Sequence, residues 1–293
     1  MSTSPSRSLF GSLKDKLSGK SRSRSPSPNP LASPAPSFSS ARSNPSITSA
    51  EDKYAFLSSF DTIFLIDDSG SMYGERWKET KAALLAIAPI CTDHDANGID
   101  IYFLNTRSKP SKSDPGGWCN IRTKAQVEAL FNQVTPRGVT PLGTRINQIL
   151  MPYLRTYEAA VKRTGTPEDC GVKPINMIVI TDGVPTDDPE SIIVDAARKL
   201  DKLEAPPHQV GIQLFQVGDE TEATKFLKEL DDGLAEVGGV RDMVDTVTFD
   251  KRSGRDKTLS ADAILKVVLG AVVKRLDRRR MSGESRRAGH LAP

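Results

Sequence analysis

Phe64-Leu65-Ile66-Asp67-Asp68-Ser69-Gly70-Ser71-Met72 is a short apolar run that passes directly into an acidic, hydroxyl-rich loop. The apolar part is typical of a buried strand, and the Asp-x-Ser-x-Ser pattern that follows places three oxygen-bearing side chains two residues apart in a turn. One carboxylate and two hydroxyls are hard oxygen ligands, which suit Mg²⁺ or Mn²⁺ better than zinc. A site with so little protein charge leaves a cation partly unneutralised, so the cation can take an acidic group from another molecule.

Strand-like and helix-like segments alternate from residue 54 to residue 277. This alternation predicts an α/β fold, a doubly wound, mainly parallel Rossmann-like sheet flanked by helices on both faces. The run Ile175–Thr181 is the most continuously apolar, so we expect it in the middle of the sheet. The expected strands are 61–66, 99–104, 116–122 (a short edge strand), 175–181, 210–217 and 243–249 (an edge strand). The expected helices are 75–90, 124–133, 142–163, 189–203 (capped by Asp187 or Asp188), 222–230 and 261–276.

Composition sets the two ends apart from this domain. Residues 1–50 contain 17 Ser and 7 Pro, which predicts a disordered basic tail, and residues 278–293 form a second basic tail that we also expect to be disordered. Residues 1–50 have a net charge of +6 and residues 274–293 one of +5, so residues 51–273 have a net charge of −8. The tails suit weak contacts with RNA or an anionic surface, whereas the acidic body argues against a broad nucleic-acid-binding face.

The three cysteines form no CxxC pair and no even framework, which favours a reducing compartment. No apolar run reaches the roughly 18 residues of a spanning helix, and the N-terminus has no apolar core like that of a signal peptide. We therefore expect no transmembrane segment and an intracellular location, cytoplasmic or nuclear. The spacing of Cys91, His94 and Cys119 fits no structural zinc site.

Two further loops supply oxygen donors. Arg137-Gly138-Val139-Thr140-Pro141-Leu142 precedes the long expected helix, and Ile180-Thr181-Asp182-Gly183-Val184-Pro185 follows the expected central strand. In an open parallel sheet, ligands bind beyond the carboxyl ends of the strands, where such loops gather. Asp68 is not part of the pattern, and we expect it to be a solvated loop acid or a helix-end cap.

These three loops resemble the metal-ion-dependent adhesion site of the von Willebrand factor A (vWA) domain, over about residues 54–277. The family pattern is Asp-x-Ser-x-Ser, then a Thr after a glycine-rich turn, then a strand that ends in Thr-Asp-Gly. The resemblance implies that Ser69, Ser71 and Thr140 bind the cation by their hydroxyls. It also implies that Asp67 and Asp182 bind it directly or through water, with one position left for a partner's carboxylate or water. Val139 stands where the family often has a second glycine, which makes this loop stiffer.

A finer resemblance is to the intracellular A-domain proteins of filamentous fungi. It rests on the Phe-Leu-Ile-Asp-Asp-Ser-Gly-Ser start and on three later stretches, Gln213–Gly218, Arg241–Val247 and Val267–Leu276. This resemblance implies a type of module and brings no established substrate or partner.

The leading hypothesis is thus a Mg²⁺-dependent (or Mn²⁺-dependent) protein-binding module that recognises an exposed acidic residue on an unidentified partner. One alternative is a metal-dependent hydrolase, since a strand-terminal Asp67 with Mg²⁺ resembles phosphatases of the haloacid dehalogenase type. Those enzymes use Asp-x-Asp, whereas this chain has Ser69 at the second position, so we predict that the protein is not an enzyme. A purely structural vWA scaffold is the other alternative.

Overall fold

The computed structural model describes residues 55–94, 97–109, 115–236, 240–248, 260–268 and 270. The two expected tails, 1–50 and 278–293, and the end of the last expected helix, 271–276, lie outside the described residues. Within the described part of the chain, no helix combines the length and the apolar character that crossing a bilayer requires.

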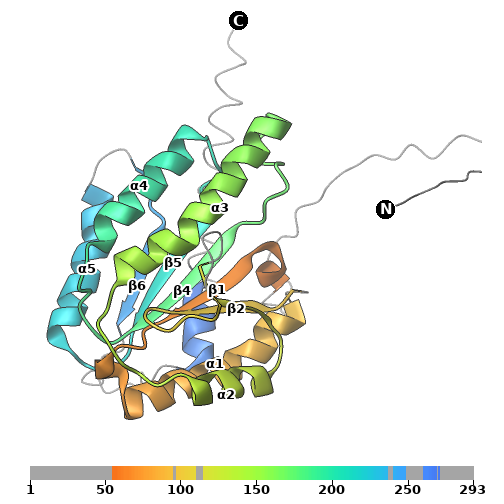
Figure 1. Ribbon diagram of the computed structural model, residues 1–293. Helices are drawn as coiled ribbons and strands as arrows, with labels where there is room; N and C mark the ends of the chain where they lie inside the picture. The colour runs from red at the N-terminus through yellow and green to blue at the C-terminus, as the bar shows by residue number, and fades with distance from the viewer. Residues whose placement is uncertain are drawn as a thin grey trace, which may run out of the picture. The chain divides into compact units, whose positions relative to one another are not determined.

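A six-stranded sheet forms the centre of the described domain, with strand order β3-β2-β1-β4-β5-β6 (Figure 1). Every neighbouring pair is parallel except β2 and β3, which are antiparallel. The predicted α/β class and mainly parallel sheet are confirmed. The strands are β1 (Asp61–Ile66), β2 (Ile99–Phe103), β3 (Trp118–Ile121), β4 (Ile175–Thr181), β5 (Val210–Gln216) and β6 (Val244–Thr248).

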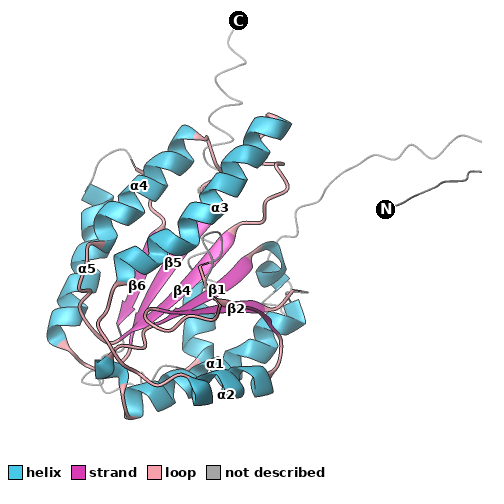
Figure 2. Ribbon diagram, in the orientation of Figure 1, coloured by secondary structure: helices cyan, strands magenta, loops and turns pink. Residues whose placement is uncertain are grey.

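Helices cover both faces of the sheet, and Figure 2 shows them as an outer layer around the strands. The two short 3-10 turns are η1 (Ala55–Ser59) and η2 (Gly70–Met72). The α-helices are α1 (Glu75–His94), α2 (Lys124–Gln133), α3 (Leu142–Thr164), α4 (Pro189–Lys202) and α5 (Thr221–Glu236), and residues 261–268 are also helical. Helix α1 ends one turn later than expected because its buried stripe continues to Cys91.

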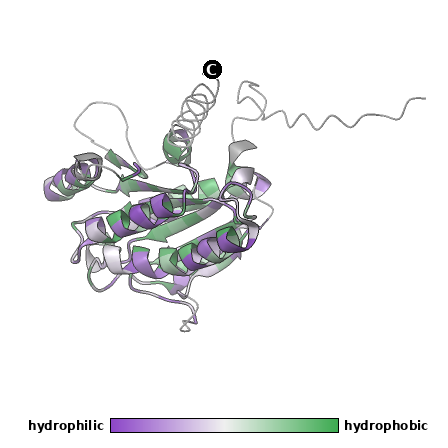
Figure 3. Ribbon diagram, turned by 90° about the horizontal axis from the view of Figure 1, so that it is seen from above, coloured by the Kyte–Doolittle hydropathy of each residue, from purple (hydrophilic) through white to green (hydrophobic). Residues whose placement is uncertain are grey.

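Alternation along β1 divides the core into two layers. Ile63 and Leu65 pack with α3, α4 and α5, whereas Phe64 and Ile66 pack with α1, α2 and the helix at 261–268. Successive side chains of a strand point to opposite faces, so one strand contributes to both layers. Figure 3 shows the same pattern, with hydrophobic strands enclosed by helices that carry hydrophilic residues.

Strand β4 is the structural centre, as predicted. All seven of its residues are buried, and it pairs with β1 on one side and with β5 on the other. A strand covered on both faces and along both edges favours an uninterrupted apolar sequence. The strands expected at the edges, β3 and β6, are at the two ends of the sheet.

The two acids before α4 serve two different helices. Asp188 caps α4 by accepting a hydrogen bond from the Ser191 amide (3.1 Å), which was one of the two expected arrangements. Asp187 instead accepts from the amides of Gly143 (2.9 Å) and Thr144 (2.7 Å) at the start of α3. A carboxylate at a helix N-terminus satisfies amides that have no partner within the helix. The loop after β4 is thereby fastened to the start of α3.

We predict that Gly143→Ala destabilises the protein by about 1–3 kcal/mol, the usual cost of overpacking. A Cβ at this position would lie 2.6 Å from the Asp188 carbonyl oxygen, so the contact between the α3 and α4 termini must open. Urea denaturation followed by tryptophan fluorescence measures the change. Gly183→Ala is the control, because a Cβ there meets no atom within 4 Å. Equal stability of the two variants would contradict this account of the junction.

Candidate metal-binding site

The carboxyl ends of β1 and β4 bring two distant acidic residues to one edge of the sheet. Ile66 of β1 lies opposite Ile180 of β4, and the Asp67 amide donates to the Ile180 carbonyl oxygen (2.8 Å). Asp67 and Asp182 therefore follow adjacent parallel strands, and both side chains are 0% exposed. Two buried carboxylates at a strand edge need hydrogen-bond donors or a cation, because an uncompensated buried charge is costly.

Two serines connect these carboxylates, through one backbone amide and two hydroxyls. The Ser69 amide donates to Asp67 Oδ1 (2.8 Å), and the hydroxyl oxygens of Ser69 and Ser71 lie 2.9 Å apart. The Ser71 hydroxyl then donates to Asp182 Oδ1 (2.8 Å). The structure therefore brings together four of the five residues that the sequence predicts as ligands, and all of them offer hard oxygen atoms.

Thr140, the fifth predicted residue, is buried in a loop that lies against both others. The Gly70 amide donates to the Gly138 carbonyl oxygen (3.2 Å), and the Thr186 amide donates to the Thr140 carbonyl oxygen (2.9 Å). Gly138 has φ +88°, a conformation that favours glycine, and a Cβ there would lie 2.9 Å from Asn105 Oδ1. The chain of side-chain hydrogen bonds does not extend to Thr140, so backbone contacts hold its loop beside the cluster.

Burial raises the pKa of Asp67 from 3.8 to about 6. The Thr181 hydroxyl, which donates to Asp67 Oδ2 (2.6 Å), and the Ser69 amide oppose this rise, whereas the neighbouring Asp182 charge adds to it. The negative form of Asp67 is thus disfavoured in the protein alone. A divalent cation at this position would stabilise that form, so proton and metal would compete for the carboxylate.

Arg76, near the start of α1, belongs to the site although its sequence position gives no sign of it. Its guanidinium donates to Asp182 Oδ2 (2.6 Å) and to Glu220 Oε1 (2.7 Å). These partners lie 106 and 144 residues away along the chain, so no local spacing could have indicated the contact. The ion pair holds Asp182 with Oδ1 toward Ser71 and Oδ2 toward Arg76.

The expectation for Asp68 was wrong. Its side chain is 0% exposed and accepts four hydrogen bonds from the loop after β2. The donors are the Asn105 amide (2.7 Å) and Nδ2 (3.1 Å), and the Thr106 amide (2.9 Å) and hydroxyl (2.6 Å). Asp67, its neighbour along the chain, lies among the candidate ligands. Asp68 instead holds the end of β2 at the same edge of the sheet. A buried carboxylate that accepts this many hydrogen bonds needs no contact with solvent.

Within the described residues, no group of three His, Cys, Asp or Glu side chains is arranged to hold a metal ion. The candidate set has two carboxylates, and its other donors are hydroxyls. Cys91, Cys119 and Cys170 take part in no disulfide, and Cys119 is exposed whereas the other two are buried.

No family model matches the chain, and no curated protein is significantly similar to it. The candidate site therefore rests on the geometry of its own residues.

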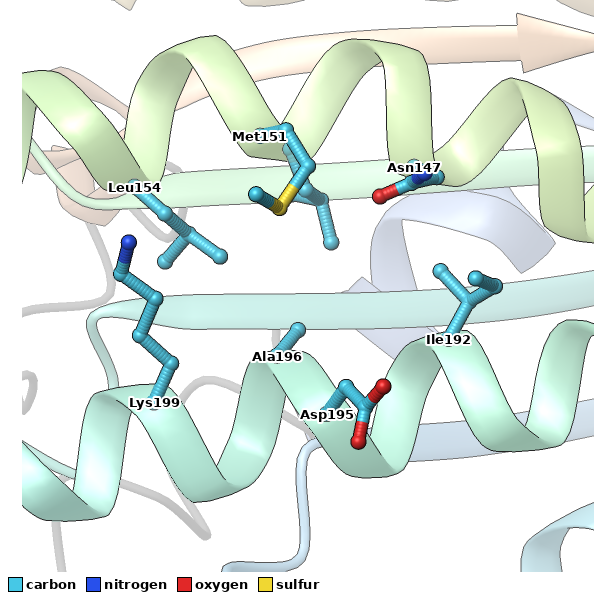
Figure 4. Close-up of a pocket in the computed structure, with 8 residues that line it drawn as sticks. Asn147, Met151, Leu154, Ile192, Asp195, Ala196 and Lys199 are labelled. Carbon is cyan, nitrogen blue, oxygen red and sulfur yellow. The ribbon is translucent and has the colours of Figure 1, made fainter.

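A separate groove lies between α3 and α4 and has a volume of about 310 Å³ (Figure 4). Met151 and Leu154 of α3 face Ile192 and Ala196 of α4 across it, and none of the five predicted ligands lines it. The Lys199 ammonium at its border pairs with Glu158 (2.8 Å).

We predict that Asp67→Asn raises the stability of the metal-free protein at pH 7 by up to about 3 kcal/mol. The pKa of Asp67 is higher in the folded protein than in the unfolded chain. Its contribution to stability is therefore greatest below pH 3.8, where it is protonated in both states, and is lost as the pH rises through about 6. Asn is neutral at every pH and does not carry this cost. Thermal denaturation in EDTA, from pH 7 to pH 5, measures both proteins. The gap between them should shrink as the pH falls, and a gap independent of pH would contradict the assignment.

We predict that Asp68→Ala destabilises the protein by about 3 kcal/mol, because the two backbone amides and the Thr106 hydroxyl, which are partly buried, lose their acceptor. Urea denaturation gives the free energy of unfolding. Asp68→Asn keeps one acceptor oxygen and should cost distinctly less. If both variants unfold like the unmodified protein, the four hydrogen bonds do not hold the loop.

Proposed function

We propose that this protein is a Mg²⁺-dependent protein-binding module of the vWA type that takes an acidic side chain from a partner protein. The observation that carries the proposal is the hydrogen-bonded chain Asp67–Ser69–Ser71–Asp182 at the carboxyl edge of the sheet. Hard oxygen donors from two strand ends, with a third loop alongside, suit Mg²⁺ or Mn²⁺.

In this proposal Ser69, Ser71 and Thr140 offer hydroxyl ligands, and Asp67 and Asp182 bind the ion directly or through water. The burial of the ligand set supports binding of an ion. Both carboxylates are buried, whereas Ser71 is exposed, so an ion or a partner's carboxylate could reach the site from solvent. The two carboxylates would only balance the charge of a divalent ion, and Asp182 is already shared with Arg76. The ion would therefore keep an attraction for a further anionic ligand.

We propose binding rather than catalysis because the second position of an Asp-x-Asp phosphatase centre is occupied by Ser69. The hydroxyl of Ser69 lies 2.9 Å from that of Ser71 and offers no carboxylate for acid–base chemistry. The lack of disulfides among the three cysteines supports a reducing, intracellular location. The basic tails would add weak contacts with RNA or an anionic surface.

We predict that saturating Mg²⁺ or Mn²⁺ stabilises the full chain by about 2–3 kcal/mol when its concentration is about one hundred times Kd. Asp67→Ala and Ser69→Ala should abolish this stabilisation and the heat of binding in isothermal titration calorimetry. Thr140→Ala should weaken both.

Thr144→Ala is the matched control, because this exposed threonine lies on α3 one turn beyond Thr140. It should bind the metal as the unmodified chain does. Absence of binding by the unmodified chain, or unchanged binding in Asp67→Ala and Ser69→Ala, would refute the metal site.

A further inference from the structure

Three large hydrophobic side chains are exposed in the part of the chain that the structure describes, and each stands beside a candidate metal ligand. Tyr73 is 75% exposed, Val139 is 58% exposed and Val184 is 42% exposed. Tyr73 comes two residues after Ser71, Val139 directly precedes Thr140, and Val184 comes two residues after Asp182. Each of the three site loops thus contributes one exposed apolar side chain.

Backbone hydrogen bonds keep the three loops together. The Gly70 amide bonds to Gly138, next to Val139, and the Thr186 amide bonds to Thr140. Tyr73 follows the same short turn as Gly70, since the Tyr73 amide donates to the Gly70 carbonyl oxygen (3.3 Å). The exposed side chains therefore belong to one surface around the ligand cluster.

We propose that Tyr73, Val139 and Val184 form an apolar rim that selects a partner segment in which the metal-binding carboxylate is flanked by bulky apolar residues. This inference rests on the proposed metal-dependent function and deepens it by specifying the partner's neighbouring residues. The metal would bind the carboxylate, and the rim would cover the apolar side chains on either side of it.

The size of the rim favours a short segment over a second copy of this chain. An aromatic side chain buries about 150–250 Å² and a valine less, so the three together cover a few hundred Å². A stable interface between folded proteins needs about 1,000 Å² or more. An extended peptide segment with a central carboxylate fits the smaller area.

The net charge of the domain makes an acidic peptide depend on both the metal and the rim. Residues 51–273 have a net charge of −8, which repels an acidic partner at long range. Near the ligands, the exposed Arg137 in the Thr140 loop adds positive charge. Apolar contacts that exclude water would strengthen the bond between metal and carboxylate, because the attraction between charges is greater where water is excluded.

The test starts from a displayed library of short peptides with a fixed central Glu and randomised neighbours, selected on the full chain in Mg²⁺. Fluorescence anisotropy then compares three synthetic probes of the same length. In the first, Leu and Phe flank the Glu; in the second, Ser replaces both; in the third, Gln replaces the Glu. Each is measured in Mg²⁺ and in EDTA.

We expect selection of apolar flanking residues, and binding of the first probe at least about tenfold tighter than of the second, which corresponds to the burial of one large apolar side chain. Tyr73→Gln, Val139→Thr and Val184→Thr together should remove this preference while Mg²⁺ titration by calorimetry stays unchanged. Val161→Thr, at a half-buried position near the other end of α3, is the matched control and should keep the preference.

The outcomes separate this inference from the proposed function. Mg²⁺-dependent binding of the Glu probes without a preference for apolar neighbours overturns the rim and leaves the metal-dependent function intact. A Gln probe that binds as tightly as the Glu probe in Mg²⁺, or a Glu probe that binds equally well in Mg²⁺ and in EDTA, overturns the metal-dependent function. Selection of no peptide overturns both, and rim-dependent binding to phosphatidylserine vesicles in place of peptides overturns the rim as a peptide-binding surface.

Discussion

The pairing of β1 with β4 is the constraint on which the candidate site depends. Their parallel register sets Ile66 opposite Ile180, so the residues after both strands leave the sheet at the same edge. Asp67 and Asp182 become neighbours for this reason alone, since 115 residues separate them in the chain. Both strands are buried on both faces, and a shift of one residue would send each core side chain to the opposite layer. The same hydrophobic packing that fixes the register therefore fixes the distance between the two carboxylates.

Placing two carboxylates inside the protein has an electrostatic cost that the surrounding residues offset only in part. Arg76 pairs with Asp182, and Thr181 and Ser69 donate to Asp67, yet burial still raises the pKa of Asp67 to about 6. Asp68, one residue further on, accepts four hydrogen bonds and is fully used in holding a loop. Two adjacent acids thus differ in kind: one is satisfied by the protein, and the other remains better suited to a proton or a cation. Buried groups whose charge is incompletely compensated, and whose pKa is therefore shifted, are typical of functional sites.

The sequence predicted the features that depend on local pattern. The uninterrupted apolar run of β4, the alternation of strands and helices, and the capping of α4 by Asp187 or Asp188 (the structure has Asp188) all follow from periodicity or from capping chemistry. The grouping of Asp67, Ser69, Ser71 and Asp182 at one edge followed from the rule that parallel strands share a carboxyl end. What could not be predicted depends on contacts between distant segments. The ion pairs of Arg76 with Asp182 and Glu220 form only after the sheet has assembled. The same holds for the hydrogen bonds that Asp68 accepts from Asn105 and Thr106. A lone acid in a loop has the same sequence signature whether it is solvated or buried with four donors.

The site loops divide their residues between two tasks that do not compete. Asp67, Asp182 and Thr140 are buried, and hydrogen bonds hold their loops in place, so substitutions there change the stability of the fold as well as the proposed metal binding. Tyr73, Val139 and Val184 are exposed and stand one or two residues away, so their side chains can change with little effect on the core. A scaffold of this kind can keep one metal chemistry while the apolar neighbours vary. Selectivity for a partner would then reside in side chains that the fold does not need, and affinity for the carboxylate in side chains that it does.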